Sequence, residues 1–244
     1  MARRRLIATV AGALGARRGI DAIAGSLCEV ATTRPVFHLT FDDGPHPDVT
    51  PLVLEALAQA KAPATFFLLA DHAKRHPEIV GETLARGHRI GLHGRTHLRL
   101  STAPWSAITD EISKAHAELE EVAGVPVTLF RPPYGAHGLR SLSVTRMRGM
   151  RTILWSVDTD DWKGLTPTAP LQGSTERIAP GGIGLLHDTP ATGSVAGDGE
   201  QGLIGKDALT REILSEMGRR GLRPVSLDEL LSEGKPVRRA KVIL

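Results

Sequence analysis

Short apolar runs alternate with longer amphipathic segments along most of the chain. The apolar runs are rich in β-branched and aromatic residues, which is typical of buried strands. They cover residues 36–41, 64–69, 88–92, 127–130, 152–157, 182–186 and 222–225. The segments between them have apolar residues at helical spacing and cover residues 51–60, 77–86, 104–122, 139–149, 170–178, 208–219 and 227–231. Regular alternation of strand and helix predicts right-handed crossovers and a parallel sheet.

Residues at the ends of these segments support the predicted helices. Thr50 and Ser226 are candidate N-caps, and Pro51 stands in the favoured first turn. Gly87 and Gly124 follow the last periodic residue of their helices, where glycine commonly ends a helix. Six or seven strand–helix units indicate an α/β fold, a (β/α) barrel formed by one domain. No Gly-x-Gly-x-x-Gly follows the first strand, which argues against a dinucleotide-binding fold.

Composition and charge exclude several classes of protein. The chain has 244 residues, of which 41% are hydrophobic and 23% charged, with a net charge of only +3. Basic residues are dispersed apart from residues 3–5 and 235–241, and no basic stripe is interleaved with aromatic residues, so nucleic acid is not expected as a partner. Cys28 is the single cysteine, which excludes an intrachain disulfide and makes a thiolate metal site improbable; we interpret it as a small buried apolar residue.

The two ends of the chain are open to more than one interpretation. We treat residues 1–34 as an N-terminal extension, in which residues 6–16 form either an amphipathic helix or the apolar core of a weak export signal. A cytoplasmic protein is preferred to an exported one. The apolar stretch is too short to span a membrane, so no transmembrane segment is expected. The tail, residues 233–244, is either a docked edge strand or a frayed end, and the oligomeric state stays open.

Candidate chemistry begins where the first predicted strand ends. Asp42 and Asp43 follow the apolar run 36–41, and alternation along a strand predicts that their side chains point in different directions. His93 and His97 follow another strand and are four residues apart, which places both imidazoles on one side of a helical turn. Together with Asp43 they form a His-His-carboxylate set typical of a catalytic divalent metal, most often zinc, with an open position for water.

Further residues could complete the chemistry of hydrolysis. Asp42, adjacent to a ligand but pointing elsewhere, is the natural base for a metal-bound water. Arg131 could pair with Asp42 and keep it ionised and oriented. The backbone N–H of Tyr134, after the turn of two prolines, could stabilise an oxyanion.

A general acid and an apolar pocket are expected near the end of a later strand. His187 is the candidate acid for the leaving group. A carboxylate neighbour would raise its pKa and fix its tautomer; Asp161 is our candidate, and Asp188 is the alternative. Trp162 and Leu185 could form the walls of a small pocket, wide enough for a methyl group.

Five segments together resemble the motifs of a known family. Residues 40–45, 93–97, 131–135, 158–162 and 185–187 are similar, in order and spacing, to the five motifs of the polysaccharide deacetylases. These are the NodB-homology enzymes of carbohydrate esterase family 4. The resemblance covers roughly residues 35–232, which we take as the catalytic domain. It implies a distorted (β/α) barrel, often seven-stranded, and metal-dependent removal of acetyl groups from N-acetylglucosamine units of chitooligosaccharides or peptidoglycan.

The resemblance also implies a role for each motif residue. Asp42 is similar to the family's catalytic base and Arg131 to the partner of that base. His187 is similar to the general acid and Asp161 to the residue that tunes it. The remaining roles are the metal ligands, Asp43, His93 and His97, and the acetyl-pocket walls, Trp162 and Leu185. The metal expected is zinc, with cobalt as an alternative, and the expected partner is a glycan substrate.

One residue departs from the family pattern. Gly94 stands where the family usually has Ser or Thr, whose hydroxyl braces the loop between the two histidines. A glycine removes this hydrogen bond and loosens the backbone, and Thr96 is our candidate for compensation. Two other functions stay open, namely an O-acetyl esterase acting on a polysaccharide such as xylan and a non-catalytic carbohydrate-binding protein.

Overall fold

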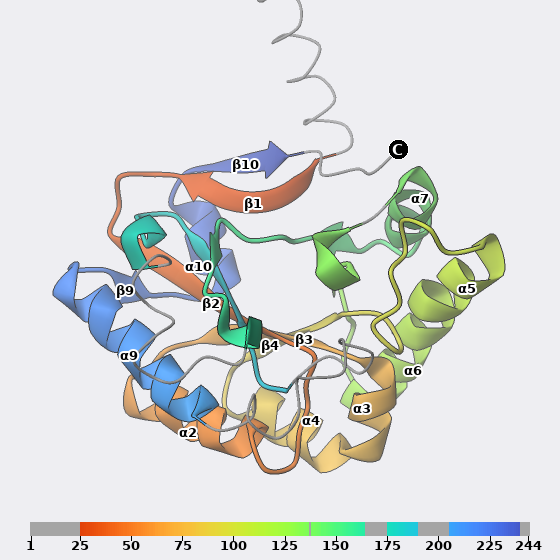
Figure 1. Ribbon diagram of the computed structural model, residues 1–244, viewed down its shortest axis with the longest axis horizontal. Coiled ribbons are helices and arrows are strands. Elements are labelled where there is room, and N and C mark those ends of the chain that lie inside the picture. Colours follow the sequence, from red (N-terminus) through yellow and green to blue (C-terminus); the bar gives the residue numbers. More distant parts are fainter. Residues whose placement is uncertain (1–24, 137, 164–174, 190–204, 240–244) are drawn as a thin grey trace, which may run out of the picture.

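The computed structural model describes residues 25–136, 138–163, 175–189 and 205–239, and its centre is a curled parallel sheet (Figure 1). Seven strands follow one another in the order β6-β5-β4-β3-β2-β8-β7. They are β2 (Val36–Asp42), β3 (Ala64–Leu68), β4 (Arg89–Leu92), β5 (Leu129–Phe130), β6 (Arg151–Thr152), β7 (Val157–Asp158) and β8 (Ile183–His187). A short β9 (Arg223–Pro224) pairs with the beginning of β2. The predicted distorted (β/α) barrel is confirmed.

Helices cover the outside of this sheet because both of its faces are apolar. Every residue of β2 and of β3 is buried, as in parallel sheets covered on both sides. The helices are α2 (Thr50–Gln59), α3 (Ala70–Arg75), α4 (Pro77–Ala85), α5 (Trp105–Thr109), α6 (Ala115–Ala123), α7 (Leu139–Met147), α9 (Lys206–Arg219) and α10 (Leu227–Ser232). A π-helical turn, η1 (Asp110–Lys114), joins α5 to α6. In the described part of the chain no helix is both long and apolar enough to cross a membrane.

The predicted helix ends are largely confirmed, with one correction. Gly124 ends α6 in the left-handed region at φ 66°, and the Ser226 hydroxyl accepts a hydrogen bond from the Glu229 N–H at the start of α10. Thr50, in contrast, is not the cap of α2. It is the first residue of the helix, and its hydroxyl donates to Asp188 Oδ2 at 2.7 Å. The predicted helix 170–178 lies partly outside the described residues, and Thr175–Arg177 form a single 3-10 turn, η4.

The prediction of one continuous strand over residues 152–157 is wrong for its middle residues, because the structure has two separate strands there, β6 and β7. The break has a physical reason in Arg131. Its buried guanidinium binds the carbonyl oxygens of Ile153, at 3.2 Å from Nε, and of Leu154, at 3.1 Å from Nη2. These two carbonyls therefore serve a side chain instead of a neighbouring strand of the parallel sheet.

Two strands from opposite ends of the chain lie side by side next to the barrel (Figure 1). β1 (Ser26–Ala31) and β10 (Lys235–Arg239) form an antiparallel pair. β1 also bridges to Ile153 beyond β6 and to Gly182 before β8, so it contacts the sheet region at two separate places. The tail thus forms a docked strand as far as Arg239, and the expected N-terminal helix or signal lies outside the described residues.

The parallel strands bring the candidate residues to one edge of the sheet. Asp42 ends β2 and His187 ends β8, and the two are direct partners in the register of these strands. His93 follows β4 and Arg131 follows β5. Active sites of parallel α/β proteins form at this carboxyl edge.

Candidate active site

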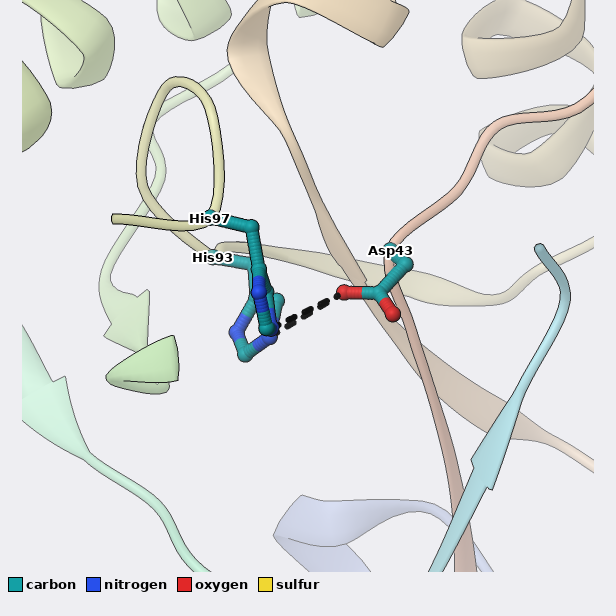
Figure 2. Close-up of side chains that lie close together, drawn as sticks. All are labelled: Asp43, His93 and His97. Carbon is teal, nitrogen blue, oxygen red and sulfur yellow. Dashed lines mark ion pairs between the residues drawn. The ribbon is translucent and has the colours of Figure 1, made fainter. Parts of the chain in front are cut away.

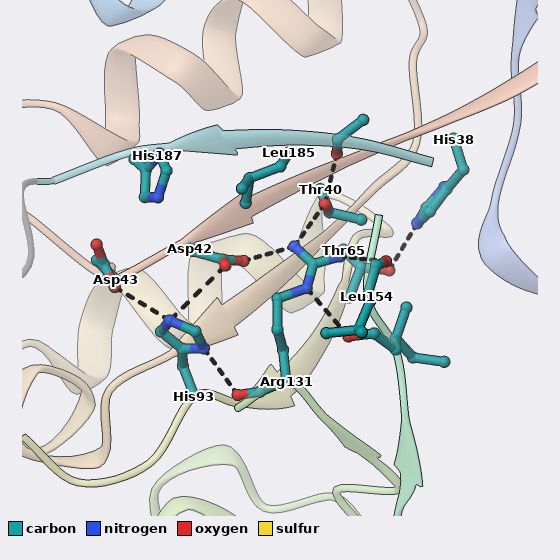
Figure 3. A network of polar contacts seen from close by, with 12 residues as sticks. His38, Thr40, Asp42, Asp43, Thr65, His93, Arg131, Leu154, Leu185 and His187 are labelled. Atoms are coloured by element: carbon teal, nitrogen blue, oxygen red, sulfur yellow. Dashed lines mark hydrogen bonds and ion pairs between the residues drawn. The ribbon is translucent and has the colours of Figure 1, made fainter. Parts of the chain in front are cut away.

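The turn after β2 gives its two carboxylates separate surroundings. Asp43 leaves the strand at φ 78°, a left-handed conformation that is uncommon for a residue other than glycine. Its N–H donates to Phe67 O at 3.1 Å, and its carbonyl accepts a hydrogen bond from His72 Nδ1 at 2.8 Å. Asp42 keeps the strand conformation and turns toward Arg131 (Figure 3). The two aspartates thus take different directions through a change of backbone conformation as well as through strand alternation.

Asp43, His93 and His97 converge on a point at the edge of the sheet (Figure 2). Asp43 Oδ1 lies 3.3 Å from His93 Nε2 and 3.6 Å from His97 Nε2. All three side chains are buried, and one ligand atom from each lies within 4.8 Å of the others. No other group of this kind occurs among the described residues.

A hydrogen bond at the other ring nitrogen of His93 leaves Nε2 free to act as a ligand. His93 Nδ1 lies 2.8 Å from Arg131 O. Because a carbonyl oxygen only accepts, Nδ1 carries the hydrogen, and in the neutral ring the lone pair of Nε2 faces Asp43. Such a bond to the outer nitrogen is the usual way in which proteins orient a histidine that binds metal.

The donor set fits a divalent metal such as zinc. Two imidazoles and one carboxylate are a known catalytic zinc set, with a further position left for water. Asp43 Oδ1 is buried and accepts no hydrogen bond from the described residues, which is a costly arrangement for a carboxylate unless a cation lies beside it.

Arg131 holds the Asp42 carboxylate in one position. Its side chain is fully buried, and Nη1 donates to Asp42 Oδ1 and to Thr40 Oγ1, each at 2.7 Å (Figure 3). Thr40 in turn donates to Gly184 O, which ties β2 to β8. The guanidinium also stacks on the Phe67 ring, 4.2 Å from its centroid. The charge-assisted bond holds the Asp42 carboxylate in one orientation, with Oδ2 lying 3.7 Å from His93 Nε2.

His187 forms a second polar chain on the other side of the site. Its Nδ1 lies 2.7 Å from Asp161 Oδ1, and its N–H donates to Asp161 Oδ2 at 2.9 Å. Lys206 completes the chain, with Nζ 2.6 Å from Asp161 Oδ2. Burial alone would lower the pKa of His187, but the Asp161 carboxylate, with smaller contributions from Asp43 and Asp42, raises it to about 9.

Asp161, and not Asp188, is the carboxylate in contact with His187. Asp188 is fully buried on the other side of the Asp42–Asp43 turn, where it accepts the Thr50 hydroxyl. It also lies against Gly44, where a Cβ would collide with its carboxylate. Burial raises the pKa of Asp188 to about 7. The geometry therefore selects the first of the two partners that the sequence left open for His187.

The remaining candidates surround these groups at different depths. Leu185 is buried in β8, whereas Trp162 is about half exposed, with 51% of its surface accessible. Tyr134, at φ 60°, is 45% exposed, and its ring packs edge-on against His97 with centroids 4.3 Å apart. The Arg99 guanidinium stacks on the same ring at 4.2 Å.

Sequence reasoning missed three residues that hold the site together. His72 binds the backbone of Asp43, Lys206 binds Asp161, and Glu111 binds the loop that carries His97. A lysine in the first turn of a helix opposes the helix dipole, which was the one available signal for Lys206. Glu111 stands in an ordinary helical pattern, and His72 lies between a predicted strand and a predicted helix, in the helix α3 that the sequence did not predict. Neither residue carried a signal of its own.

Comparison with known proteins identifies the family. Residues 29–153 match the model of the family described as polysaccharide deacetylase. The chain is 36% identical over 167 residues to a chitooligosaccharide deacetylase of Azorhizobium caulinodans, covering 68% of this chain and 80% of that protein. It is 34% identical over 197 residues to a peptidoglycan-N-acetylglucosamine deacetylase of Bacillus cereus, covering 81% of this chain and 68% of that protein.

The fold agrees with this assignment. The crystal structure of the Bc1960 peptidoglycan N-acetylglucosamine deacetylase, in complex with 4-naphthalen-1-yl-N-oxidanyl-benzamide, superposes with a TM-score of 0.75 at 30% identity. The match covers 86% of this chain and 94% of that chain. The chain belongs to the polysaccharide deacetylase family, whose members include the enzymes of carbohydrate esterase family 4.

Proposed function

We propose that this protein is a metal-dependent hydrolase that removes N-acetyl groups from glycans containing N-acetylglucosamine and releases acetate. The observation that carries the proposal is the buried Asp43–His93–His97 triad, flanked by two polar chains with different properties. On one side Arg131 holds Asp42, and on the other Asp161 holds His187. The relatives named above act on chitooligosaccharides and peptidoglycan, and the substrate proposed here is of the same class.

Asp43, His93 and His97 would hold the cation, with zinc as the first choice and cobalt as the second. A bound divalent metal supplies Lewis acidity, which lowers the pKa of a water molecule and polarises the acetamide carbonyl. Asp42, held in one orientation by Arg131, takes the proton of the attacking water. The backbone N–H of Tyr134 donates to the oxygen that becomes negative as the water adds to the carbonyl carbon.

His187 is the proton donor for the leaving group. Its raised pKa keeps the imidazole protonated at neutral pH, which an acid requires and a base does not. Protonation of the nitrogen lets the carbon–nitrogen bond break, so that acetate and a free amino sugar are released. Leu185 and Trp162 are proposed as the apolar walls around the acetyl methyl group.

Acetate release from a chitooligosaccharide tests the proposal. We expect release to stop when a chelator removes the metal and to return when zinc or cobalt is added. Asp42→Asn in the metal-loaded protein should lower kcat by about 10²–10⁴-fold, the usual contribution of a positioned base. Asp48→Asn is the matched control, because this exposed aspartate lies on the same loop and outside the site.

Parallel assays with peptidoglycan fragments and O-acetylated xylan separate the alternatives. Acetate from the xylan alone would indicate an esterase and reject the proposed N-deacetylation. Glycan binding without turnover by the metal-loaded protein, unchanged by Asp42→Asn, would reject catalysis altogether.

A further inference from the structure

The loop between the two histidines of the triad has a brace of its own. Gly94 lacks the hydroxyl expected there, yet several backbone groups of residues 94–96 have hydrogen-bond partners. Glu111 Oε2 accepts the Arg95 N–H at 2.7 Å and the Thr96 N–H at 3.1 Å. Glu111 Oε1 accepts the Thr96 hydroxyl at 2.6 Å. One carboxylate, only 5% exposed, therefore binds three donors of this loop.

The carbonyl groups of the same loop are bound from the opposite side. The first N–H groups of α3 point at them, with Ala70 N–H donating to Gly94 O at 3.0 Å and Asp71 N–H to Arg95 O at 3.4 Å. The loop is thus held between a helix N-terminus, which binds its acceptors, and the Glu111 carboxylate, which binds its donors. Glu111 binds the donors through its side chain, whereas α3 binds the acceptors through its backbone N–H groups.

Gly94 and Glu111 depend on each other. Gly94 has φ 92°, and a Cβ at this position would lie 2.9 Å from Glu111 Oε2. A side chain at position 94 and the carboxylate of Glu111 therefore compete for one space. A side chain at position 94 would have to move the carboxylate end of Glu111 and would also adopt a backbone conformation that L residues rarely take.

The helix that carries Glu111 is irregular at this point. Glu111 lies in the π-helical turn η1, between α5 and α6. A π-turn inserts one extra residue into a helix, and such turns are rare and frequent at functional sites. Here the turn contains the residue that reaches the loop, while Ile112 of the same turn stays buried in the core.

We propose that Glu111 is a positioning residue for the metal ligands. By binding Arg95 and Thr96 it keeps the loop in the conformation in which His97, at φ 67°, directs Nε2 toward Asp43. The inference rests on the proposed function only in that a divalent metal occupies the triad. Thr96 takes part in the brace as a partner of Glu111, and does not replace the missing hydroxyl alone.

Zinc affinity, measured without substrate by competition with a chelator, tests this role. Loss of a group that orients metal ligands typically weakens binding by 10–100-fold, so we expect Glu111→Ala to bind zinc about 10–100-fold more weakly. Glu111→Gln keeps one oxygen acceptor for the two N–H groups and should lose much less affinity. Glu121→Gln is the control on the same helix, since this residue is exposed, and Asp43→Asn shows the loss of a ligand.

Gly94→Ala provides an independent measurement. It should weaken zinc binding in the wild-type background, because the new Cβ meets the Glu111 carboxylate and because an L residue is strained at φ 92°. In the Glu111→Ala background the same change should have a smaller effect, since the atom with which it collides is gone. Circular dichroism of each variant restricts the comparison to folded protein, and Glu111→Gln and Gly94→Ala retain the test where Glu111→Ala does not fold.

The outcomes separate this inference from the proposed function. Zinc affinity of Glu111→Ala within twofold of wild type would overturn the positioning role. Additive effects of Gly94→Ala and Glu111→Ala would show that Gly94 acts through its own backbone conformation, and would overturn its link to Glu111. Weakened zinc binding in the variants, with no acetate released by the wild type, would keep the role of Glu111 and reject the deacetylase. Absence of zinc binding by the wild type would reject both.

Discussion

At the scale of single residues, the site combines uncommon backbone conformations with buried charges. Asp43, His97, Tyr134 and Asp160 all have positive φ angles, between 57° and 78°. Each such conformation costs of the order of 1–3 kcal/mol and persists only where the surroundings impose it. Hydrogen bonds from His72 and Glu111 supply part of that support for Asp43 and for the loop of His97. The surroundings of the site therefore impose backbone conformations that these residues would otherwise rarely adopt.

Asp161→Asn should move the alkaline limb of the pH–rate profile to lower pH. In its proposed role, His187 can act as an acid only while it is protonated, which holds below its pKa. Burial lowers that pKa and Asp161 raises it to about 9, so loss of the carboxylate should return it toward or below the ordinary value of 6.5. Activity would then fall at a lower pH than in the wild type.

The measurement is kcat/KM across the pH range for metal-loaded protein. Asp207→Asn is the control, because this carboxylate lies on α9 beside Lys206 and pairs with Arg211 instead of with His187. An alkaline limb that does not move in Asp161→Asn would assign it to another group and remove His187 from the role of acid.

At the scale of elements, the Arg131 side chain binds backbone carbonyl groups that a neighbouring strand would otherwise bind. Its guanidinium binds the carbonyls of Ile153 and Leu154 between β6 and β7 and holds Asp42 at the end of β2. Arg131→Met should therefore lower the free energy of unfolding by about 3–5 kcal/mol, because it leaves a buried carboxylate unpaired. Urea unfolding of the metal-free protein measures the change, and the exposed Arg151→Met should stay within about 0.5 kcal/mol of wild type.

A double variant tests the reason given for this loss. If the unpaired Asp42 charge is the cause, Asp42→Asn added to Arg131→Met should recover part of the lost stability. An equal or larger loss in the double variant would show that Arg131 acts mainly through the carbonyls of the broken strand.

The elements that the sequence predicted are those with a local signal. β2 and β3 are continuous apolar runs, and Gly124 and Ser226 stand at the helix ends for which their chemistry suits them. The break between β6 and β7 had no such signal, because it depends on a guanidinium more than twenty residues earlier in the chain. The same holds for the site. Its motif residues were visible in the sequence, whereas Glu111 and Lys206 act through contacts between distant segments.

At the scale of the whole molecule, the strand pair β1 and β10 packs against the curled sheet. β1 pairs with β10 and contacts Ile153, which follows β6, and Gly182, which precedes β8. Leu27 and Val30 of β1 are buried in a core cluster with Ile153 and with residues from β8 and α10. The barrel that carries the site at its carboxyl edge therefore depends on a strand that lies before the predicted catalytic domain.

Gly181→Ala tests this packing of β1 against the barrel. Gly181 O accepts the Val30 N–H at 2.9 Å, and Gly181 has φ 80°. A Cβ at this position would collide with Val30 O, so the substitution pushes β1 away from the start of β8.

Gly149→Ala is a matched control, since Gly149 has φ 71° and a Cβ there would meet nothing within 4 Å. The control should lose about 1–2 kcal/mol from its backbone conformation alone. Gly181→Ala should lose about 3–4 kcal/mol in urea unfolding, because steric overpacking adds to the same penalty. Equal losses in the two variants would mean that β1 can leave the barrel without cost, and that the fold of the site is independent of this strand.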